Sequence, residues 1–324
     1  MASKGVLEWL LEKDQPSIRY RALTELLGRT ESDPEVREAR RRIPTVGWAA
    51  DILAERNPEG WWVTPENHFH PKYVSTYWKM LVLADLGLTR DLPAIAESVE
   101  LWTRTKPVQR REPGQHLPGG LHLCVVGMSA RALIQLGYAD DPRVGEGLEW
   151  IVKTADPRGG WACMGRPGHG RNIDASWKAL GALAAHPRPK RTAGMQRCIE
   201  RCAEFYLERE LHRQGARYEP WYRFHYPVHY YYDVLVGLDL LTSLGYAGDP
   251  RLKFAIELLK QKRRPDGRWN LEAVHPDNPD GEAKYESWYR DHPEDRPRPF
   301  ALETPGAPSK MITLRAQVIL SRVG

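Results

Sequence analysis

The chain has 324 residues, of which 41% are hydrophobic and 27% charged, and its formal net charge is +5. The charge is modest and spread along the chain, which argues against a nucleic-acid-binding protein with a basic face. No apolar run approaches the roughly 20 residues of a membrane span, and no signal-peptide-like stretch is present. We therefore expect a cytoplasmic protein, with peripheral membrane contact and oligomeric state left open.

Aromatic composition is the unusual feature, with 12 Trp and 14 Tyr against 5 Phe. Trp and Tyr combine an apolar ring with a polar group and favour surfaces that are partly wet, which indicates a lined cavity as well as a core. The four cysteines give no disulfide framework at this length. Cys198 and Cys202 share one helical face and are expected to be buried, idle thiols.

The first third of the chain is predicted to form short helices divided by turns. Apolar spacing indicates helices over 5–13, 35–42 and 47–56, and Pro16-Ser17 starts another helix that ends at Gly28. The stretch His68-Phe69-His70-Pro71 then leads into an almost wholly apolar helix that ends at Gly87, with an amphipathic partner over 93–103.

The same alternation continues to the C-terminus. Helices are predicted over the following ranges: 121–136, 144–154, 174–185, 193–211, 232–244, 250–262 and 309–322. An aromatic segment occupies 218–232, before the helix at 232–244. Residues 271–308 are polar and proline-rich, and we expect them to form a long excursion or lid over a single domain of residues 1–324.

The helices repeat in pairs. A shift of 99 residues places Trp78-Lys79 on Trp177-Lys178, and Leu-Gly ends several of the apolar helices. Six helices are apolar nearly all round, as expected for helices buried on both sides, whereas their partners have a solvated face. The first and last of these helices are similar to each other, so a closed ring would need no capping repeat at either end. We therefore predict an all-α fold, an α/α toroid made of about six helical hairpins in a closed ring.

Three Gly-x-Trp turns, each closing an amphipathic helix, carry a family resemblance. They are Gly60-Trp61-Trp62, Gly159-Gly160-Trp161 and Gly267-Arg268-Trp269. These turns resemble the repeat motif of the squalene cyclases and the protein prenyltransferase β subunits, over about residues 16–322. The resemblance implies a toroid whose central cavity holds an isoprenoid.

The catalytic motifs of those families are incomplete in this chain. The Asp-x-Asp-Asp-Thr-Ala motif of the squalene-hopene-type cyclases corresponds to Arg171-Asn172-Ile173-Asp174-Ala175-Ser176, where only Asp174 agrees and Ile173 replaces the proton donor. The zinc-binding Asp-x-Cys of the prenyltransferases is missing, although His229 lies close to where their zinc-binding His would fall. No Asp-Asp-x-x-Asp sequence for diphosphate ionisation is present either.

The repeat register singles out candidate catalytic residues. Asp174 and Asp233 fall at equivalent points near the starts of two inner helices, and His229 lies just before the second. A neutral carboxyl in an aromatic pocket could act as a general acid, so these three residues are the catalytic candidates. The alternative is that both aspartates are helix N-caps, a role for which Asp is favoured.

Candidate ligand-binding residues gather at the same end of the predicted ring. Aromatic faces there could stabilise a carbocation or stack on a sugar. The candidates are His70, Tyr77, His122, Cys124, Trp177, Trp221, Tyr222, His225, Tyr230, Tyr231 and Tyr232. Such mixed donors could hold zinc, but no pair has the spacing of a known zinc motif, so no metal ligand is assigned and the cofactor is left unknown.

Three functions fit these features. The first is a terpenoid-cyclase-like or prenyltransferase-like toroid that binds an isoprenoid or other apolar ligand, and could cyclise it by protonation. The second is a carbohydrate-active lyase or glycosidase, and the third is a lipid-binding toroid without catalysis. Whether the chain is an enzyme depends on the cavity: a closed apolar lining favours an isoprenoid, and an open polar groove favours a sugar.

Overall fold

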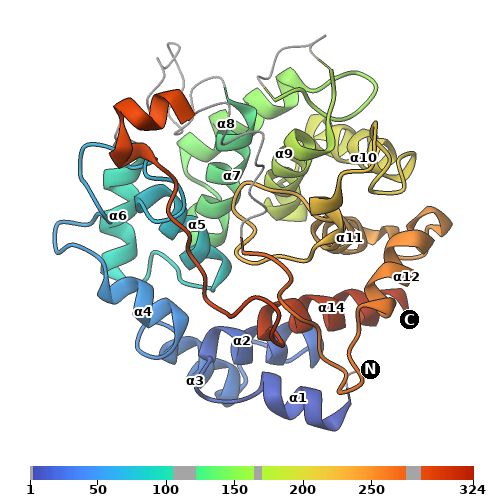
Figure 1. Cartoon of the computed structure of the whole chain (residues 1–324), viewed down its shortest axis with the longest axis horizontal. Helices are drawn as coiled ribbons and strands as arrows, with labels where there is room; N and C mark the ends of the chain where they lie inside the picture. Colours follow the sequence, from blue (N-terminus) through green and yellow to red (C-terminus); the bar gives the residue numbers. More distant parts are fainter. Residues whose placement is uncertain (1–2, 105–121, 164–169, 275–285) are drawn as a thin grey trace.

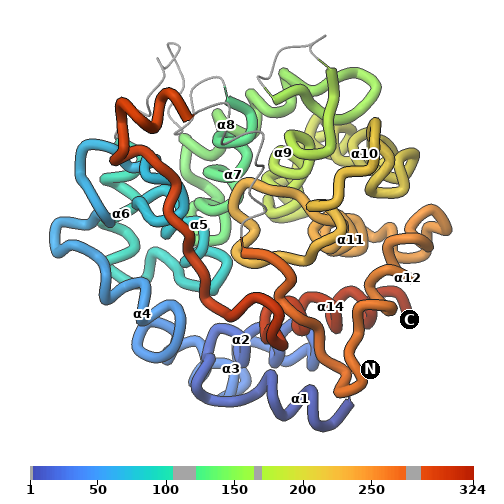
Figure 2. Tube along the Cα trace, viewed as in Figure 1, coloured from blue at the N-terminus to red at the C-terminus, as the bar shows by residue number. Residues whose placement is uncertain are grey.

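A computed structural model describes residues 3–104, 122–163, 170–274 and 286–324. In these ranges the regular structure is helical, and β-pairing is confined to two isolated bridges. The helices form two concentric layers around a common centre, as Figures 1 and 2 show. The fold is an α/α toroid, as predicted.

Six helical segments make the inner layer. Their residues are buried on almost every side, and one continuous hydrophobic core includes side chains from all of them. Three of them end in a π-helical turn. They are α2 (Pro16–Arg21) with η1 (Ala22–Leu26), α5 (Thr76–Asp85), α7 (Leu123–Leu133) with η2 (Ile134–Tyr138), α9 (Ile173–Ala185), α11 (Val234–Leu241) with η5 (Thr242–Tyr246), and α14 (Lys310–Val323).

The ring closes through its ends, because α14 packs against both α11 and α2. Lys310 Nζ lies 2.6 Å from a carboxylate oxygen of Glu12, and Arg21 Nη1 lies 3.3 Å from the Met311 sulfur. The N- and C-termini consequently lie near each other in Figure 1. The predicted pairing of the helix after Pro16 with the helix after Pro308 is confirmed.

Amphipathic helices form the outer layer. Several begin with Asp-Pro, where the Asp carboxylate accepts a backbone N–H and Pro occupies the first helical position. The predicted helix over 193–211 ends early, because Glu210 and Leu211 adopt positive φ values of 45° and 70°. The outer helices are α1 (Lys4–Leu10), α3 (Pro34–Arg42), α4 (Trp48–Ala54), α6 (Pro93–Arg104), α8 (Pro142–Thr154), α10 (Ala193–Leu207) and α12 (Lys253–Gln261).

Each Gly-x-Trp turn fastens an outer helix to the inner helix that follows. The glycines Gly60, Gly159 and Gly267 take φ values of 108°, 88° and 83°, which glycine alone adopts readily. Each Trp donates its indole N–H to the carbonyl ten residues earlier and its backbone N–H to a hydroxyl of the next inner helix. The acceptors are Ile52 and Thr76 for Trp62, Ile151 and Ser176 for Trp161, and Leu259 and Thr313 for Trp269.

The C-terminal part of the predicted lid crosses one face of the ring on its way to α14, as Figure 1 shows. Its backbone is tied to the segment before α5, where the Arg298 N–H donates to the Lys72 carbonyl at 3.2 Å. The Phe300 ring lies 3.8 Å from Lys79 Nζ. Residues 275–285 of the predicted excursion lie outside the described residues, and its role as a lid stays a prediction.

Replacing Trp161 with alanine should lower the free energy of unfolding by about 3 to 5 kcal/mol, because the side chain is fully buried and its 2.8 Å hydrogen bond to Ile151 is lost. Urea unfolding at neutral pH measures the change. Trp288→Ala is the matched control, since that indole is 47% exposed and its loss should change stability by about 0.5 kcal/mol or less. Equal stabilities for the two variants would contradict the anchoring role.

Candidate ligand-binding cavity

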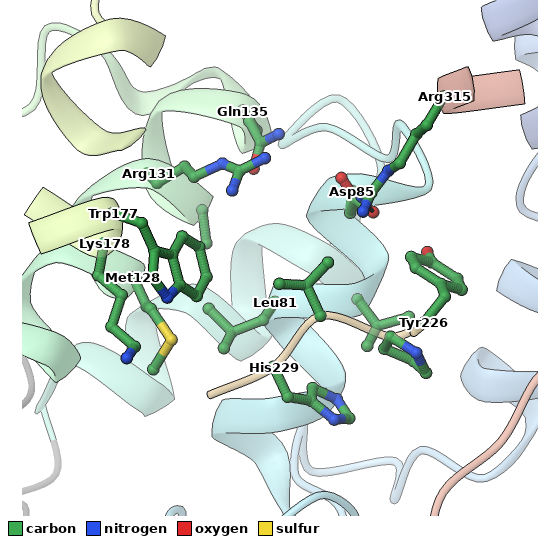
Figure 3. A pocket seen from close by; sticks show the side chains of 14 residues that line it. Leu81, Asp85, Met128, Arg131, Gln135, Trp177, Lys178, Tyr226, His229 and Arg315 are labelled. Atoms are coloured by element: carbon green, nitrogen blue, oxygen red, sulfur yellow. Dashed lines mark hydrogen bonds and ion pairs between the residues drawn. The ribbon is translucent and has the colours of Figure 1, made fainter. Parts of the chain in front are cut away.

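The middle of the toroid contains a small cavity of about 50 Å³, shown in Figure 3. A second hollow of about 440 Å³ adjoins it, and the two share Arg131, Gln135, Trp177, Val228 and Arg315. Most of the lining comes from the C-terminal halves of inner helices. The volume of the second hollow lies within the usual range of small-molecule sites.

The segment before α11 limits the cavity. Residues Tyr226 to His229 cross the interior and supply part of its wall. Asp233, the N-cap of α11, fixes this segment. Its carboxylate accepts the backbone N–H of His225 at 3.0 Å and the ring Nδ1–H of the same residue at 2.7 Å. Residues Tyr226 to His229 thus occupy part of the centre of the ring and reduce the space that a ligand could fill.

One side of the cavity carries a buried charge pair. Asp85, the last residue of α5, lies 2.8 Å from an Arg315 guanidinium nitrogen of α14 and 4.0 Å from Arg21. Burial acts to raise the pKa of Asp85, but Arg315, Arg21 and Arg131 together hold it below its ordinary value. The carboxyl on this wall is therefore ionised at neutral pH and is a poor proton donor.

Arg131 of α7 faces the same space from the opposite side, as Figure 3 shows. Within the residues that the structure describes, no hydrogen bond or ion pair of 4.0 Å or less joins the Arg131 guanidinium to another residue. Burial lowers the pKa of its guanidinium, which Asp85 and Asp239 partly restore. A cation that is half-buried and without a close anion favours binding an anionic or strongly polar group.

The remaining wall is apolar. Leu81, Met128, Trp177 and Val228 line the space between the charged groups. The Trp177 indole N–H is buried without a hydrogen-bond partner among the described residues. The cavity is thus neither wholly apolar nor an open polar groove, and it suits a ligand with an apolar body and a polar head.

Of the three candidate catalytic residues, Asp233 is a structural cap. It is fully buried, and besides its bonds to His225 it accepts the Val236 N–H at 2.8 Å. The other ring nitrogen of His225 lies 3.2 Å from the Val228 carbonyl, so both nitrogens face acceptors and both donate when the ring is protonated. These contacts account for Asp233 without catalysis, while a catalytic role stays untested.

Asp174 occupies the first turn of α9, where Asn172 is the N-cap. Burial raises the pKa of its carboxyl; the Lys178 ammonium lowers it, as do the Trp221 indole and the Tyr232 backbone. Asp174 is not among the cavity-lining residues, but Lys178, one turn further along α9, does line the cavity. Asp174 therefore lies one turn from a cavity-lining residue, and its role as an acid stays a prediction.

His229, the third candidate, lines the cavity directly. It has a positive φ of 39°, and its ring stacks on Tyr73 with centroids 5.2 Å apart and meets Trp78 edge-on at 5.5 Å. Trp177 also lines the cavity, as expected of a ligand-binding residue. His229 and Trp177 therefore line the same cavity, whereas Asp233 does not line it.

Several of the predicted ligand-binding aromatics pack in the toroid wall. Tyr232 donates its hydroxyl to the Leu211 carbonyl at 2.9 Å, and Trp221 meets the Tyr232 ring edge-on at 5.6 Å. Tyr222 lies under the Arg217 guanidinium, and Tyr77 is buried against Trp102. None of these four lines the cavity.

The other predicted ligand-binding residues lie near the starts of inner helices. Cys124 and Tyr230 meet beside Lys178, whose Nζ is 4.5 Å from the centre of the Tyr230 ring. Burial lowers the pKa of both His70 and His122. His70, His122, Cys124, His225, Tyr230 and Tyr231 are also absent from the cavity lining.

Sequence reasoning missed the charged lining residues Asp85, Arg131 and Arg315. Arg131 is the single charge of the otherwise apolar helix α7, and Arg131 and Gln135 are four residues apart on one face of α7 and η2. A lone charge in a helix predicted to be buried on both sides was the available signal, because such a group needs a partner or a cavity.

In the part of the chain that the structure describes, no three or more His, Cys, Asp or Glu side chains gather closely enough to hold a metal ion. Within residues 3–104, 122–163, 170–274 and 286–324, no helix has both the length and the apolar character to span a bilayer.

Comparison with known proteins gives structural neighbours at low sequence identity. No protein-family model matches the chain, and no curated protein does. A protein from Actinoplanes is 17% identical, with 95% of this chain and 89% of that chain covered and a TM-score of 0.42. A variant of the type II terpene cyclase MstE from Scytonema, in complex with geranylgeranyl dihydroxybenzoate, is 14% identical, with 99% and 98% covered and a TM-score of 0.33.

Another MstE variant, in complex with merosterolic acid A, is 16% identical, with 85% of this chain and 93% of that chain covered and a TM-score of 0.31. Scores of this size assign neither a family nor a function. The toroid described above rests on the chain's own helix contacts.

Asparagine substitutions should separate the two aspartates by their effect on stability. Folding raises the pKa of the Asp174 carboxyl above its unfolded-state value of about 3.9. The stability that this carboxyl contributes to the fold is therefore greatest at low pH, and it is lost as the pH rises from about 3.9 through the folded-state pKa. Asp174→Asn should therefore melt at or above the wild-type temperature at pH 7, and this advantage should shrink towards pH 4. Thermal melting between these pH values measures it.

Asp233→Asn should instead melt lower at neutral pH. Whichever way the amide turns, its NH2 group faces a backbone or ring N–H that the carboxylate accepts, at a cost of about 1 to 3 kcal/mol. Equal losses of stability in the two variants at pH 7 would contradict the assignment of one residue as a cap and the other as a buried acid.

Proposed function

We propose that this toroid binds a small isoprenoid-like ligand in its central cavity. The apolar body of the ligand lies against Leu81, Met128 and Trp177, and an anionic or strongly polar head group lies beside Arg131. The observation that carries the proposal is this juxtaposition of an apolar wall with a guanidinium that no anion approaches closely within the described residues. An apolar cavity with few placed polar groups is the usual form of a small-molecule site.

The neighbouring charges support an anionic head over a cationic one. The carboxylates of Asp85 and Asp239 already have their own partners, Arg315 at 2.8 Å and Arg322 at 2.7 Å. Among the described residues, Arg131 and Lys178 then remain as cavity-lining cations without a carboxylate in an ion pair of 4.0 Å or less. The interior therefore has an excess of positive charge that a carboxylate or phosphate would balance.

A matched pair of ligands tests the proposal. Farnesoic acid and farnesol share one apolar chain and differ in the charge of the head group, and quenching of Trp fluorescence reports their binding near Trp177. The acid should bind more tightly than the alcohol. Arg131→Gln should weaken binding of the acid by about tenfold or more, because a charge-assisted hydrogen bond contributes roughly 1.5 to 3 kcal/mol, and should leave the alcohol unchanged.

Arg209→Gln is the control, since this guanidinium lies over the Phe205 ring and not in the cavity. Its affinities should equal those of the wild type. Binding of neutral oligosaccharides in place of both probes would favour the carbohydrate-active alternative and overturn the proposal. Equal affinity of the acid for the wild type and Arg131→Gln would remove the head-group site.

Cyclisation by protonation is the second candidate, and the raised pKa of Asp174 favours it. Asp85 is held ionised and is a poor proton donor, whereas Asp174 precedes the cavity-lining Lys178 by one turn of α9. Incubation with a polyprenyl substrate and analysis of the products by mass spectrometry tests this role. A cyclic product that the wild type and Asp174→Asn form equally would exclude Asp174 as the acid.

A further inference from the structure

Two thiols meet at the end of the toroid opposite the charged cavity wall. Cys124 is the second residue of α7, and Cys163 lies in the connection between the Trp161 turn and α9. Their sulfur atoms are 3.6 Å apart although 39 residues separate them in sequence. The two backbones are joined as well, because the Leu123 N–H donates to the Cys163 carbonyl at 3.2 Å.

We propose that Cys124 and Cys163 form a reversible dithiol–disulfide site that reacts with hydrogen peroxide or a small organic peroxide. A disulfide needs a sulfur–sulfur distance of about 2.05 Å, so the sulfurs must approach by roughly 1.5 Å. Rotation of two short side chains about the Cα–Cβ bond supplies such a movement while the backbone hydrogen bond keeps the segments together. The site is independent of the proposed function of the central cavity.

The chemistry balances with peroxide as the oxidant. The Cys124 thiolate attacks one peroxide oxygen, the O–O bond breaks, and the departing oxygen takes a proton to leave as water, so Cys124 becomes a sulfenic acid. The Cys163 sulfur then attacks the Cys124 sulfur and displaces hydroxide, which leaves as a second water with the Cys163 proton. Each sulfur loses one electron, and the peroxide gains both.

The surroundings make Cys124 the attacking residue. The hydrogen bond from Cys163 lowers its pKa most, and Lys178 and Tyr230 add to the effect against burial, so that the pKa is about 6. The pKa of Cys163 is raised, first by its hydrogen bond to Cys124 and then by burial. The titratable groups that face Cys124 come from four directions: Cys163 before α9, Asp174 and Lys178 in α9, Tyr230 before α11, and Tyr77 in α5.

The chain contains its own control pair. Cys198 and Cys202 are four residues apart in α10, a spacing that places Cβ atoms about 5 to 6 Å apart, beyond the roughly 3.5 to 4.5 Å of a disulfide. Burial raises the pKa of both thiols. Cys198 and Cys202 thus experience the same solution conditions as Cys124 and Cys163. They lack both the short sulfur–sulfur distance and a thiol with a lowered pKa.

Peptide mapping of the full chain tests the proposal. After treatment with hydrogen peroxide and alkylation of the remaining thiols, tryptic peptides 112–131 and 159–171 should be recovered as one disulfide-linked species that dithiothreitol separates. Cys124 and Cys163 should lose their free thiols about tenfold faster than Cys198 and Cys202 at pH 7. The rate should be nearly flat from about pH 7 to 8.5, since the pKa of Cys124 is about 6 and its thiolate is already formed.

Single substitutions identify the order of the two steps. Cys163→Ser removes the second sulfur, so dimedone should label a sulfenic acid at Cys124, whereas Cys124→Ser should give neither label nor linked peptide. Circular dichroism checks the fold of each variant, and the wild-type map decides the matter if a variant misfolds. Equal oxidation rates for all four cysteines, or a linked species that forms only in urea, would overturn the proposal.

Discussion

The structure depends on one repeated interaction, the buried indole of the Gly-x-Trp turn. In each copy the indole N–H donates to the preceding outer helix, and the backbone N–H of the same residue donates to a hydroxyl of the following inner helix. One side chain thus fixes the outer helix, the turn and the inner helix together. Because the inner helices are positioned from outside, their cavity faces are free to carry groups that a packed core excludes, such as Arg131 and Asp85.

This dependence explains why the fold could be predicted from the sequence. The determinants of each hairpin are local: a glycine with positive φ, a Trp at fixed spacing, and a Leu-Gly helix end such as Gly137 or Gly245, both near 100° in φ. They recur often enough to be recognised without knowledge of tertiary contacts. The predicted ring closure also rested on local similarity, between the starts at Pro16 and Pro308, and α14 does pack beside α2.

The site could not be predicted in the same way, because its residues are joined by contacts across the ring. Asp85 and Arg315 are 230 residues apart, and a buried ion pair is stable only when both charges arrive together. The aromatic segment illustrates the same difficulty. Its density indicated a cavity lining, but the bonds of Asp233 to His225 fold the segment back, so that Trp221 and Tyr232 face the wall while His229 reaches the cavity.

The equivalent lysines Lys79 and Lys178 show how repeats of one pattern acquire different chemistry. Both side chains are almost fully buried, and a buried ammonium needs compensation. Lys79 is 2.7 Å from the Glu55 carboxylate. Lys178 instead donates to the Asp174 carbonyl at 2.5 Å and lies against the Tyr230 ring, and its ammonium lowers the pKa of the Cys124 thiol. The same ammonium lowers the pKa of the Asp174 carboxyl. Because Lys178 also lines the cavity, the cavity wall and the surroundings of the thiol pair share this one ammonium group.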